Sequence, residues 1–200
     1  FWFFGIHDAA LAGVLGPIRD GNLSINAAAK AAGEALPHVF TTPFWVYFVI
    51  IGGCGSLLAL AILLVRSKSK QLKTLGRIFI GPSIFNINEP IMFGAPVVFN
   101  PLLMLPMWLN SIVGPAIVYI VMSLGWLNIP ATLNQVGQVP VPVSTVMITQ
   151  DMRGILWAVV LFVVYFAIWY PFFKVFEKQK LAEEAQEKPY MFWTNQLRDF

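Results

Sequence analysis

The chain has 200 residues, of which 58% are hydrophobic and only 12% are charged, whereas about 25% are charged in a typical soluble domain. Its net charge is +3, and the single cysteine, Cys54, lies in an apolar run and provides no disulfide framework. This composition excludes an ordinary soluble domain and indicates an all-α integral membrane protein. The sequence carries no zinc motif, Walker loop or dinucleotide fingerprint, and its basic residues lie at expected membrane edges, so we expect neither a metal site nor nucleic-acid binding.

Residues 1–18 are predicted to be the end of a membrane element, and we expect further segments before it because the chain starts in mid-pattern without Met. His7 and Asp8 lie within this stretch, and ionisable side chains inside a membrane are usually functional. Since imidazole titrates near neutral pH, we predict a catalytic role for His7; the alternative is a histidine at a helix end without a function. Residues 19–42, which include the candidate binding residue Asn26, are expected at the outer boundary.

A 23-residue run without charge, Pro43–Val65, is long enough to cross a bilayer as one helix. The small residues at 52–56 indicate either close helix packing or a backbone opened towards a ligand, and Gly53 is a candidate binding residue on the second interpretation. The following segment, Arg66–Arg77, carries five basic residues and no acidic one. Such a loop beside a span predicts a cytoplasmic position, and it could also be a docking surface for an acidic protein.

The stretch Ile78–Gln150 contains one charged side chain in 73 residues, Glu89. A lone carboxylate in such an apolar segment indicates a functional site that faces a protein or water cavity. Asn86 and Asn88 flank it with amide groups, and four prolines between positions 82 and 101 interrupt any continuous helix. Carboxylate, amides and free backbone groups together suit a neutral, polyhydroxylated ligand.

Two clear spans are predicted, Leu102–Trp126 and Gly154–Phe173, and Lys174 after the second again indicates the cytoplasmic side. These spans supply the even number of crossings required between Arg77 and Lys174. The stretch Ile78–Pro101 is therefore predicted to be a re-entrant hairpin, with the lone carboxylate near its tip.

The remaining segments complete the predicted organisation. Residues 130–150 would lie on the outer side, as a loop or a shallow second dip. Residues 1–176 form a membrane-embedded domain in this interpretation, and residues 177–200, which are polar and mixed in charge, form a cytoplasmic tail that is an exposed helix or disordered.

Several short sequence blocks resemble those of one protein family, and they follow one another in the family's order through nearly the whole chain. The blocks are Phe3–His7, Gly16–Ile18, Gly52–Gly55, Lys68–Lys73, Phe85–Gly94, Asn100–Pro101 and Tyr170–Phe173. They resemble the membrane subunit, enzyme IIC, of the bacterial phosphoenolpyruvate-dependent sugar phosphotransferase system. The lactose/cellobiose/diacetylchitobiose branch is the most similar, and the block around Glu89 is the most specific. The chain would correspond to the C-terminal half of such a subunit.

This resemblance implies a permease that binds a β-linked disaccharide outside, carries it inwards and presents its 6-hydroxyl to a phosphocysteine on a cytoplasmic IIB partner. It implies no cofactor, because the phosphoryl group comes from IIB, so phosphotransferase activity would exist only with that partner. His7 and Glu89 match the family positions near the reacting hydroxyl. The candidate sugar-binding residues are Asn86, Asn88, Gly53 and Asn26. IIA as a further partner, a homodimer formed mainly through the N-terminal half, and a multi-pass location in the bacterial plasma membrane are also implied.

Two positions depart from the family pattern, and other functions are conceivable. Many family members have Gly where this chain has Asp8, and the extra carboxylate would alter the protonation of the His7 imidazole. They often have Trp where this chain has Val141, and the missing aromatic ring would remove a platform on which a sugar can stack. An ion-coupled secondary transporter also uses broken helices and a midplane carboxylate. A lipid-phosphate transferase would need Asp-rich metal motifs that the sequence lacks, and a purely structural subunit would not need Glu89 between two Asn residues.

Overall fold

The computed structural model of the chain describes residues 2–95, 97–133 and 139–196, and for residue 8 and residues 187–196 it describes the backbone alone. Within these residues the protein is helical and contains no strand, as expected for an all-α fold. The elements are η1 (Trp2–Phe4), η2 (Asp8–Leu11), α1 (Ala12–Ala32), α2 (Thr42–Phe44), η3 (Trp45–Val49), α3 (Leu57–Val65), α4 (Lys70–Ile84), α5 (Glu89–Gly94), α6 (Pro101–Ser123), α7 (Val141–Thr149) and α8 (Arg153–Gln196).

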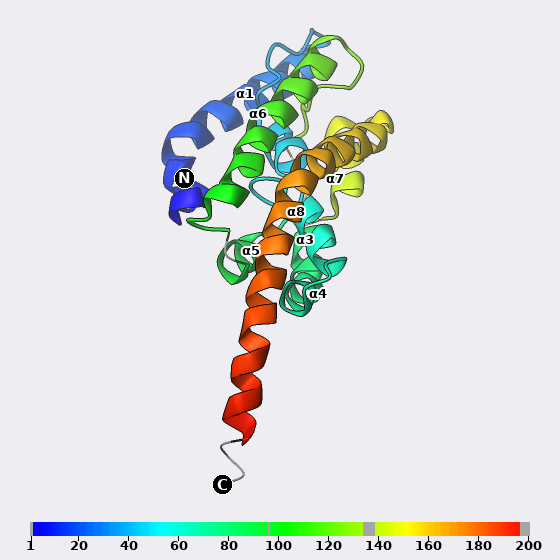
Figure 1. Cartoon of the computed structure of the whole chain (residues 1–200). Coiled ribbons are helices and arrows are strands. Elements are labelled where there is room, and N and C mark those ends of the chain that lie inside the picture. The colour runs from blue at the N-terminus through cyan, green and yellow to red at the C-terminus, as the bar shows by residue number, and fades with distance from the viewer. Residues whose placement is uncertain (1, 96, 134–138, 197–200) are drawn as a thin grey trace.

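Helix α8 organises the fold, because α3, α6 and α7 all pack against it (Figure 1). Its side chains Tyr165, Trp169 and Phe173 recur every four residues and are almost completely buried, so one face of the helix forms the core. Two helices of the described residues are long and apolar enough to cross a bilayer: Pro101–Ser123 and the part Arg153–Gln186 of α8. They overlap the two clear spans predicted from the sequence, Leu102–Trp126 and Gly154–Phe173, although the second helix continues beyond its predicted end.

The prediction of one continuous helix over Pro43–Val65 is wrong. The segment is divided into α2, the π-helical turn η3, a loop over residues 50–56 and the nine-residue α3. Gly52, Gly53 and Gly55 in this loop all have positive φ, and so does Ser56, with φ 57°. A right-handed helix cannot continue through such residues, so the small-residue cluster breaks the helix and turns the chain.

The basic segment 66–77 is not a loop throughout. The connection between α3 and α4 is confined to residues 66–69, because the Ser69 side chain accepts a hydrogen bond from the backbone N–H of Leu72 and caps α4. α4 then continues into the predicted hairpin as far as Ile84, where a bend over residues 85–88 leads to α5. The position of this segment relative to a bilayer stays a prediction.

The first part of the predicted tail is helical and bonded to the basic connection. Glu177 is only 4% exposed and accepts hydrogen bonds from the Ser67 hydroxyl and the Lys68 backbone N–H, both at 2.7 Å. Further along the same helix, Glu184 accepts hydrogen bonds from the Ser69 hydroxyl and the Gln71 backbone N–H. α8 therefore crosses the proposed domain boundary at residue 177 without interruption.

Candidate functional site

The structure brings together the two residues predicted as catalytic. The His7 Nε2 and Glu89 Oε1 atoms lie 3.3 Å apart, although the residues are 82 positions apart in the sequence. The His7 Nδ1 accepts a hydrogen bond from the Ala9 backbone N–H at 3.0 Å, which starts η2. Because Nδ1 is an acceptor, the neutral imidazole carries its proton on Nε2 and donates it to the carboxylate. Both side chains are about half exposed, at 51% and 46%, so a ligand can reach them.

Glu89 is positioned by the backbone at the start of α5. Its Oε2 accepts a hydrogen bond from the Asn88 backbone N–H at 3.1 Å, while Oε1 faces His7. Pro90 follows at the first turn of α5, where a missing N–H costs nothing. The carboxylate is therefore oriented by a backbone donor on one oxygen and an imidazole on the other, as a hydrogen-bond acceptor or proton acceptor for a ligand hydroxyl would be.

Gly53 and Asn88, both predicted binding residues, are packed against each other. Gly53 has φ +94°, and a Cβ added to it would lie 2.2 Å from the Asn88 Cβ and 2.9 Å from its Oδ1. Asn88 is only 6% exposed, and its Nδ2 has no hydrogen-bond partner among the described residues. Such an unpaired buried donor is costly unless a ligand or water satisfies it.

The amides of Asn86 and Asn26 are already bonded to backbone groups. The Asn86 Oδ1 accepts from the Gly52 N–H at 2.7 Å, and its Nδ2 donates to the Val46 carbonyl at 3.4 Å, so this residue ties the bend before α5 to the loop after η3. Asn26 is fully buried; its Nδ2 donates to the carbonyls of His38 and Pro130 and its Oδ1 accepts from the His38 N–H. Direct sugar contacts by these two residues stay predictions.

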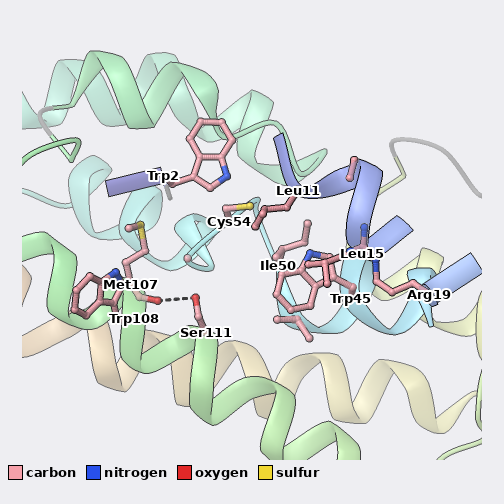
Figure 2. A pocket seen from close by; sticks show the side chains of 13 residues that line it. Trp2, Leu11, Leu15, Arg19, Trp45, Ile50, Cys54, Met107, Trp108 and Ser111 are labelled. Atoms are coloured by element: carbon pink, nitrogen blue, oxygen red, sulfur yellow. Dashed lines mark hydrogen bonds between the residues drawn. The ribbon is translucent and has the colours of Figure 1, made fainter. Parts of the chain in front are cut away.

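A cavity of about 280 Å³ lies on the other side of Trp2 from His7. Figure 2 shows its lining residues, of which Trp2 is one. The Trp2 ring lies against the His7 ring, with centroids 4.5 Å apart, and also lines the cavity. Trp45 and Trp108 line it as well, and the Arg19 guanidinium lies over the Trp45 ring at 5.8 Å. The Trp2 Nε1 and the Arg19 Nε are buried donors without a described partner. Aromatic faces with unpaired donors suit a sugar, whose C–H faces stack on rings and whose oxygens accept hydrogen bonds.

Sequence reasoning did not find Trp2, Arg19, Trp45 or Trp108. In a chain with 7 Trp and 17 Phe, an aromatic residue carries no signal of its own. Arg19 offers one weak signal, as the first Lys or Arg of the chain after the mainly apolar segment 1–18. These residues meet only because η1, α1, η3 and α6 converge on one cavity.

Two further expectations concern Asp8 and Val141. The side chain of Asp8 lies outside the described side chains, so its expected effect on the imidazole stays a prediction. Val141 is buried at the start of α7 and lines a different, apolar hollow together with Pro140 and Pro142. Among the described residues, no three His, Cys, Asp or Glu side chains are grouped as a metal site would require.

Comparisons with known proteins give a consistent result. Residues 1–111 match the family described as "Phosphotransferase system, EIIC". The chain is 41% identical over 186 residues to the lichenan permease IIC component of Bacillus subtilis (strain 168), covering 92% of this chain and 41% of that protein. It is 40% identical over 191 residues to the cellobiose-specific EIIC component of the PTS system from Geobacillus stearothermophilus, covering 93% and 42%.

The fold has a counterpart among solved structures. The crystal structure of the transporter ChbC, the IIC component from the N,N'-diacetylchitobiose-specific phosphotransferase system, superimposes with a TM-score of 0.88 at 35% identity. The match covers 92% of this chain and 43% of that one. The chain thus spans less than half the length of the proteins that it resembles.

Proposed function

Because the chain belongs to the EIIC family of the phosphotransferase system, a family of membrane proteins, we propose that it acts as the sugar permease of such a system. The substrate would be a β-linked disaccharide of the cellobiose, lactose or diacetylchitobiose type. The names of the relatives support this class, since lichenan, cellobiose and diacetylchitobiose all contain β-linked sugar units. The observation that carries the proposal is the His7–Glu89 pair beside a tryptophan-lined cavity.

Glu89 would accept the proton of the sugar 6-hydroxyl. The hydroxyl oxygen attacks the phosphorus of a phosphocysteine on IIB, a P–O bond forms, the P–S bond breaks, and the cysteine leaves as a thiolate. The hydroxyl proton passes to the Glu89 carboxylate, whose second oxygen is held by the Asn88 N–H. The His7 Nε2–H keeps the carboxylate in place and can donate to the reacting oxygens, since phosphoryl transfer depends mainly on positioning and electrostatics.

The rest of the sugar would lie against the tryptophans. A cavity of about 280 Å³ is slightly below the range of about 300–1,000 Å³ for small-molecule pockets, so it would hold one sugar unit of a disaccharide. Trp2 and Arg19, which line this cavity, would donate their unpaired N–H groups to sugar oxygens. The Asn88 Nδ2 would donate to the part of the sugar next to Glu89. For Gly53, Asn86 and Asn26 we propose positioning roles, because they hold the loops around the site.

The proposed assembly follows from this activity. IIB would phosphorylate the sugar from the cytoplasmic side and would itself receive the phosphoryl group from IIA. The permease would be a multi-pass protein of the bacterial plasma membrane. It would form a homodimer whose contacts lie mainly outside these 200 residues, and it would use no cofactor of its own.

Uptake by membrane vesicles tests the function. Vesicles with the complete permease should accumulate cellobiose 6-phosphate when phosphoenolpyruvate, the general phosphotransferase proteins, IIA and IIB are supplied. Accumulation of unmodified sugar driven by a proton or sodium gradient, without IIB, would identify an ion-coupled transporter and overturn the proposal.

A further inference from the structure

The outer surface of α3 and α4 carries a groove that the sugar permease function does not use. Near the connection between these helices it is a hollow of about 380 Å³ lined by Ile62, Val65, Arg66, Arg77 and Ile80. Three of these side chains are aliphatic and two are guanidinium groups. Both arginines are exposed, and neither has a carboxylate partner among the described residues.

A second hollow lies beside the first, because Ile62 lines both of them. Ile62 also lines an apolar hollow of about 350 Å³, which extends between α3, the end of α4, α7 and α8. Its other lining residues are apolar throughout: Ile51, Leu58, Ile84, Pro140, Val141, Pro142, Ala158, Val159 and Phe162. We call the two adjoining hollows the groove: its lining has two cations at the end formed by Arg66 and Arg77 and is apolar elsewhere.

Gly76 explains why the two arginines lie at the same place. A Cβ at position 76 would approach the Val65 backbone N to 2.4 Å and the Leu64 carbonyl carbon to 2.6 Å. Only glycine allows α4 to pack so closely on the end of α3. Arg77 follows Gly76 on α4, and Arg66 follows Val65 directly after the end of α3, so both guanidiniums flank the hollow.

We propose that this groove binds one anionic phospholipid, with the headgroup phosphate between Arg66 and Arg77 and an acyl chain along Ile62 and into the apolar hollow. Guanidinium groups bind phosphate oxygens in a bidentate manner and suit this end of the groove. Basic pockets between helices at the cytoplasmic membrane edge are typical lipid headgroup sites. An apolar protein segment would fit the remainder of the groove but would leave the two arginines without a counter-charge.

Native mass spectrometry of the complete permease in detergent tests the site, with phosphatidylglycerol and phosphatidylcholine of identical acyl chains as probes. We expect phosphatidylglycerol to bind more tightly than phosphatidylcholine. The double variant Arg66→Gln/Arg77→Gln should lose this preference by about tenfold or more, because each surface cation contributes about 1 kcal/mol to attraction of an anionic lipid. Lys73→Gln is the matched control, since Lys73 is exposed on α4 but does not line the groove, and it should keep the preference.

Two further variants keep the result interpretable. Arg66→Lys/Arg77→Lys retains both charges and should bind with an intermediate preference, even if the glutamine variant is poorly folded. Ile80→Trp, which fills the hollow, should weaken phosphatidylglycerol binding while the two arginines remain.

Several results would overturn the proposal. These are equal binding of the two lipids by the unaltered protein, equal losses in the Lys73 variant and the arginine variant, or equally tight binding of glycerol 3-phosphate without acyl chains. Efficient cross-linking of Ile62→Cys to another segment of the permease or to a second copy would show that protein covers the groove, and would also exclude the lipid.

Discussion

Gly53 and Asn88 are in van der Waals contact at a distance that no other residue at position 53 would allow. A Cβ there would lie 2.2 Å from the Asn88 Cβ, and the glycine φ of +94° is itself unfavourable for other residues. Asn88 in turn donates its backbone N–H to Glu89. The helix break after η3 is thus coupled to the orientation of the proposed catalytic carboxylate.

Gly53→Ala should therefore displace Asn88 and impair both folding and function. We expect the free energy of unfolding to fall by about 1–3 kcal/mol, as is typical of overpacking. We also expect the variant that remains folded to phosphorylate sugar much more slowly than the unaltered permease. Thermal unfolding of the purified permease and phosphorylation with IIB are the measurements. Gly13→Ala is the control, because a Cβ at position 13 meets nothing within 4 Å, and it should behave like the unaltered protein.

Glu89→Gln should abolish most of the phosphotransferase activity while leaving the fold intact. The amide keeps the shape of the side chain but cannot take a proton, and loss of a general base lowers rates by about 10²–10⁴-fold. Sugar-dependent dephosphorylation of IIB measures this directly. A rate within a few-fold of the unaltered permease, in a variant that still binds sugar, would show that Glu89 is not the base.

The two nitrogens of His7 can be tested separately. Asn at position 7 can accept the Ala9 N–H as Nδ1 does, and Asn is a favoured capping residue, but it cannot reach Glu89. Gln is long enough to donate to Glu89 from the position of Nε2 but loses the cap. If Nε2–H supports the chemistry, His7→Asn should phosphorylate sugar more slowly than His7→Gln.

Sugar affinity measured on the same pair of variants completes the test. Rates and affinities near those of the unaltered permease in both variants would exclude a catalytic role for His7. If affinity alone falls, His7 is a binding residue and Glu89 handles the proton without it.

The predicted re-entrant character of Ile78–Pro101 can be tested by cysteine labelling in a variant that lacks Cys54. Ile78 and Phe99 are suitable positions, because they lie near the two ends of this stretch and neither residue is covered by the protein, at 60% and 66% exposed. Both Ile78→Cys and Phe99→Cys should react with a membrane-impermeant reagent from the cytoplasmic side. Labelling of the two positions from opposite sides would mean that the segment crosses the membrane.

Asp151 should make stability pH-dependent at low pH. The hydrogen bond from the Arg153 guanidinium lowers the pKa of the Asp151 carboxyl below its ordinary value of 3.8, the backbone N–H groups of Arg153 and Asn128 act in the same direction, and burial opposes them. A carboxyl whose pKa is lower in the folded than in the unfolded protein stabilises the folded state at pH values above its unfolded pKa. This contribution is therefore complete above about pH 5 and is lost as the pH falls through 3.8 and below.

Asp151→Asn should remove the pH-dependent contribution that the ionised Asp151 carboxylate makes to the stability of the folded state. The loss at neutral pH should be at most about 1 kcal/mol, because Arg153 is largely exposed and solvent screens the pair. Unfolding midpoints of the two proteins, measured between pH 3 and pH 7, should converge at the acidic end; a constant difference across this range would contradict the assignment.

The sequence alone determined the class of protein and the identity of its central carboxylate. Hydropathy and charge are local properties, and they located α6 and the apolar part of α8 because a long uncharged run has few other possible structures. Glu89 was identified for the same reason, as one charge within 73 residues. The motif blocks around it were specific enough to identify the family before any contact was known.

Only the tertiary structure decided which of these residues meet. His7 and Glu89 are brought together although they are 82 positions apart. Gly53, in the loop after η3, is likewise brought against Asn88, in the bend before α5. Both contacts result from the packing of η1, α3, α4 and α5 and not from any local pattern. The break in Pro43–Val65 escaped prediction because helix length was judged from hydrophobicity, whereas the positive φ angles at Gly52, Gly53 and Gly55 are maintained by neighbours such as Asn86 and Asn110. The tryptophan-lined cavity was invisible for a similar reason: a void is a property of how several helices pack, and no single segment of sequence encodes it.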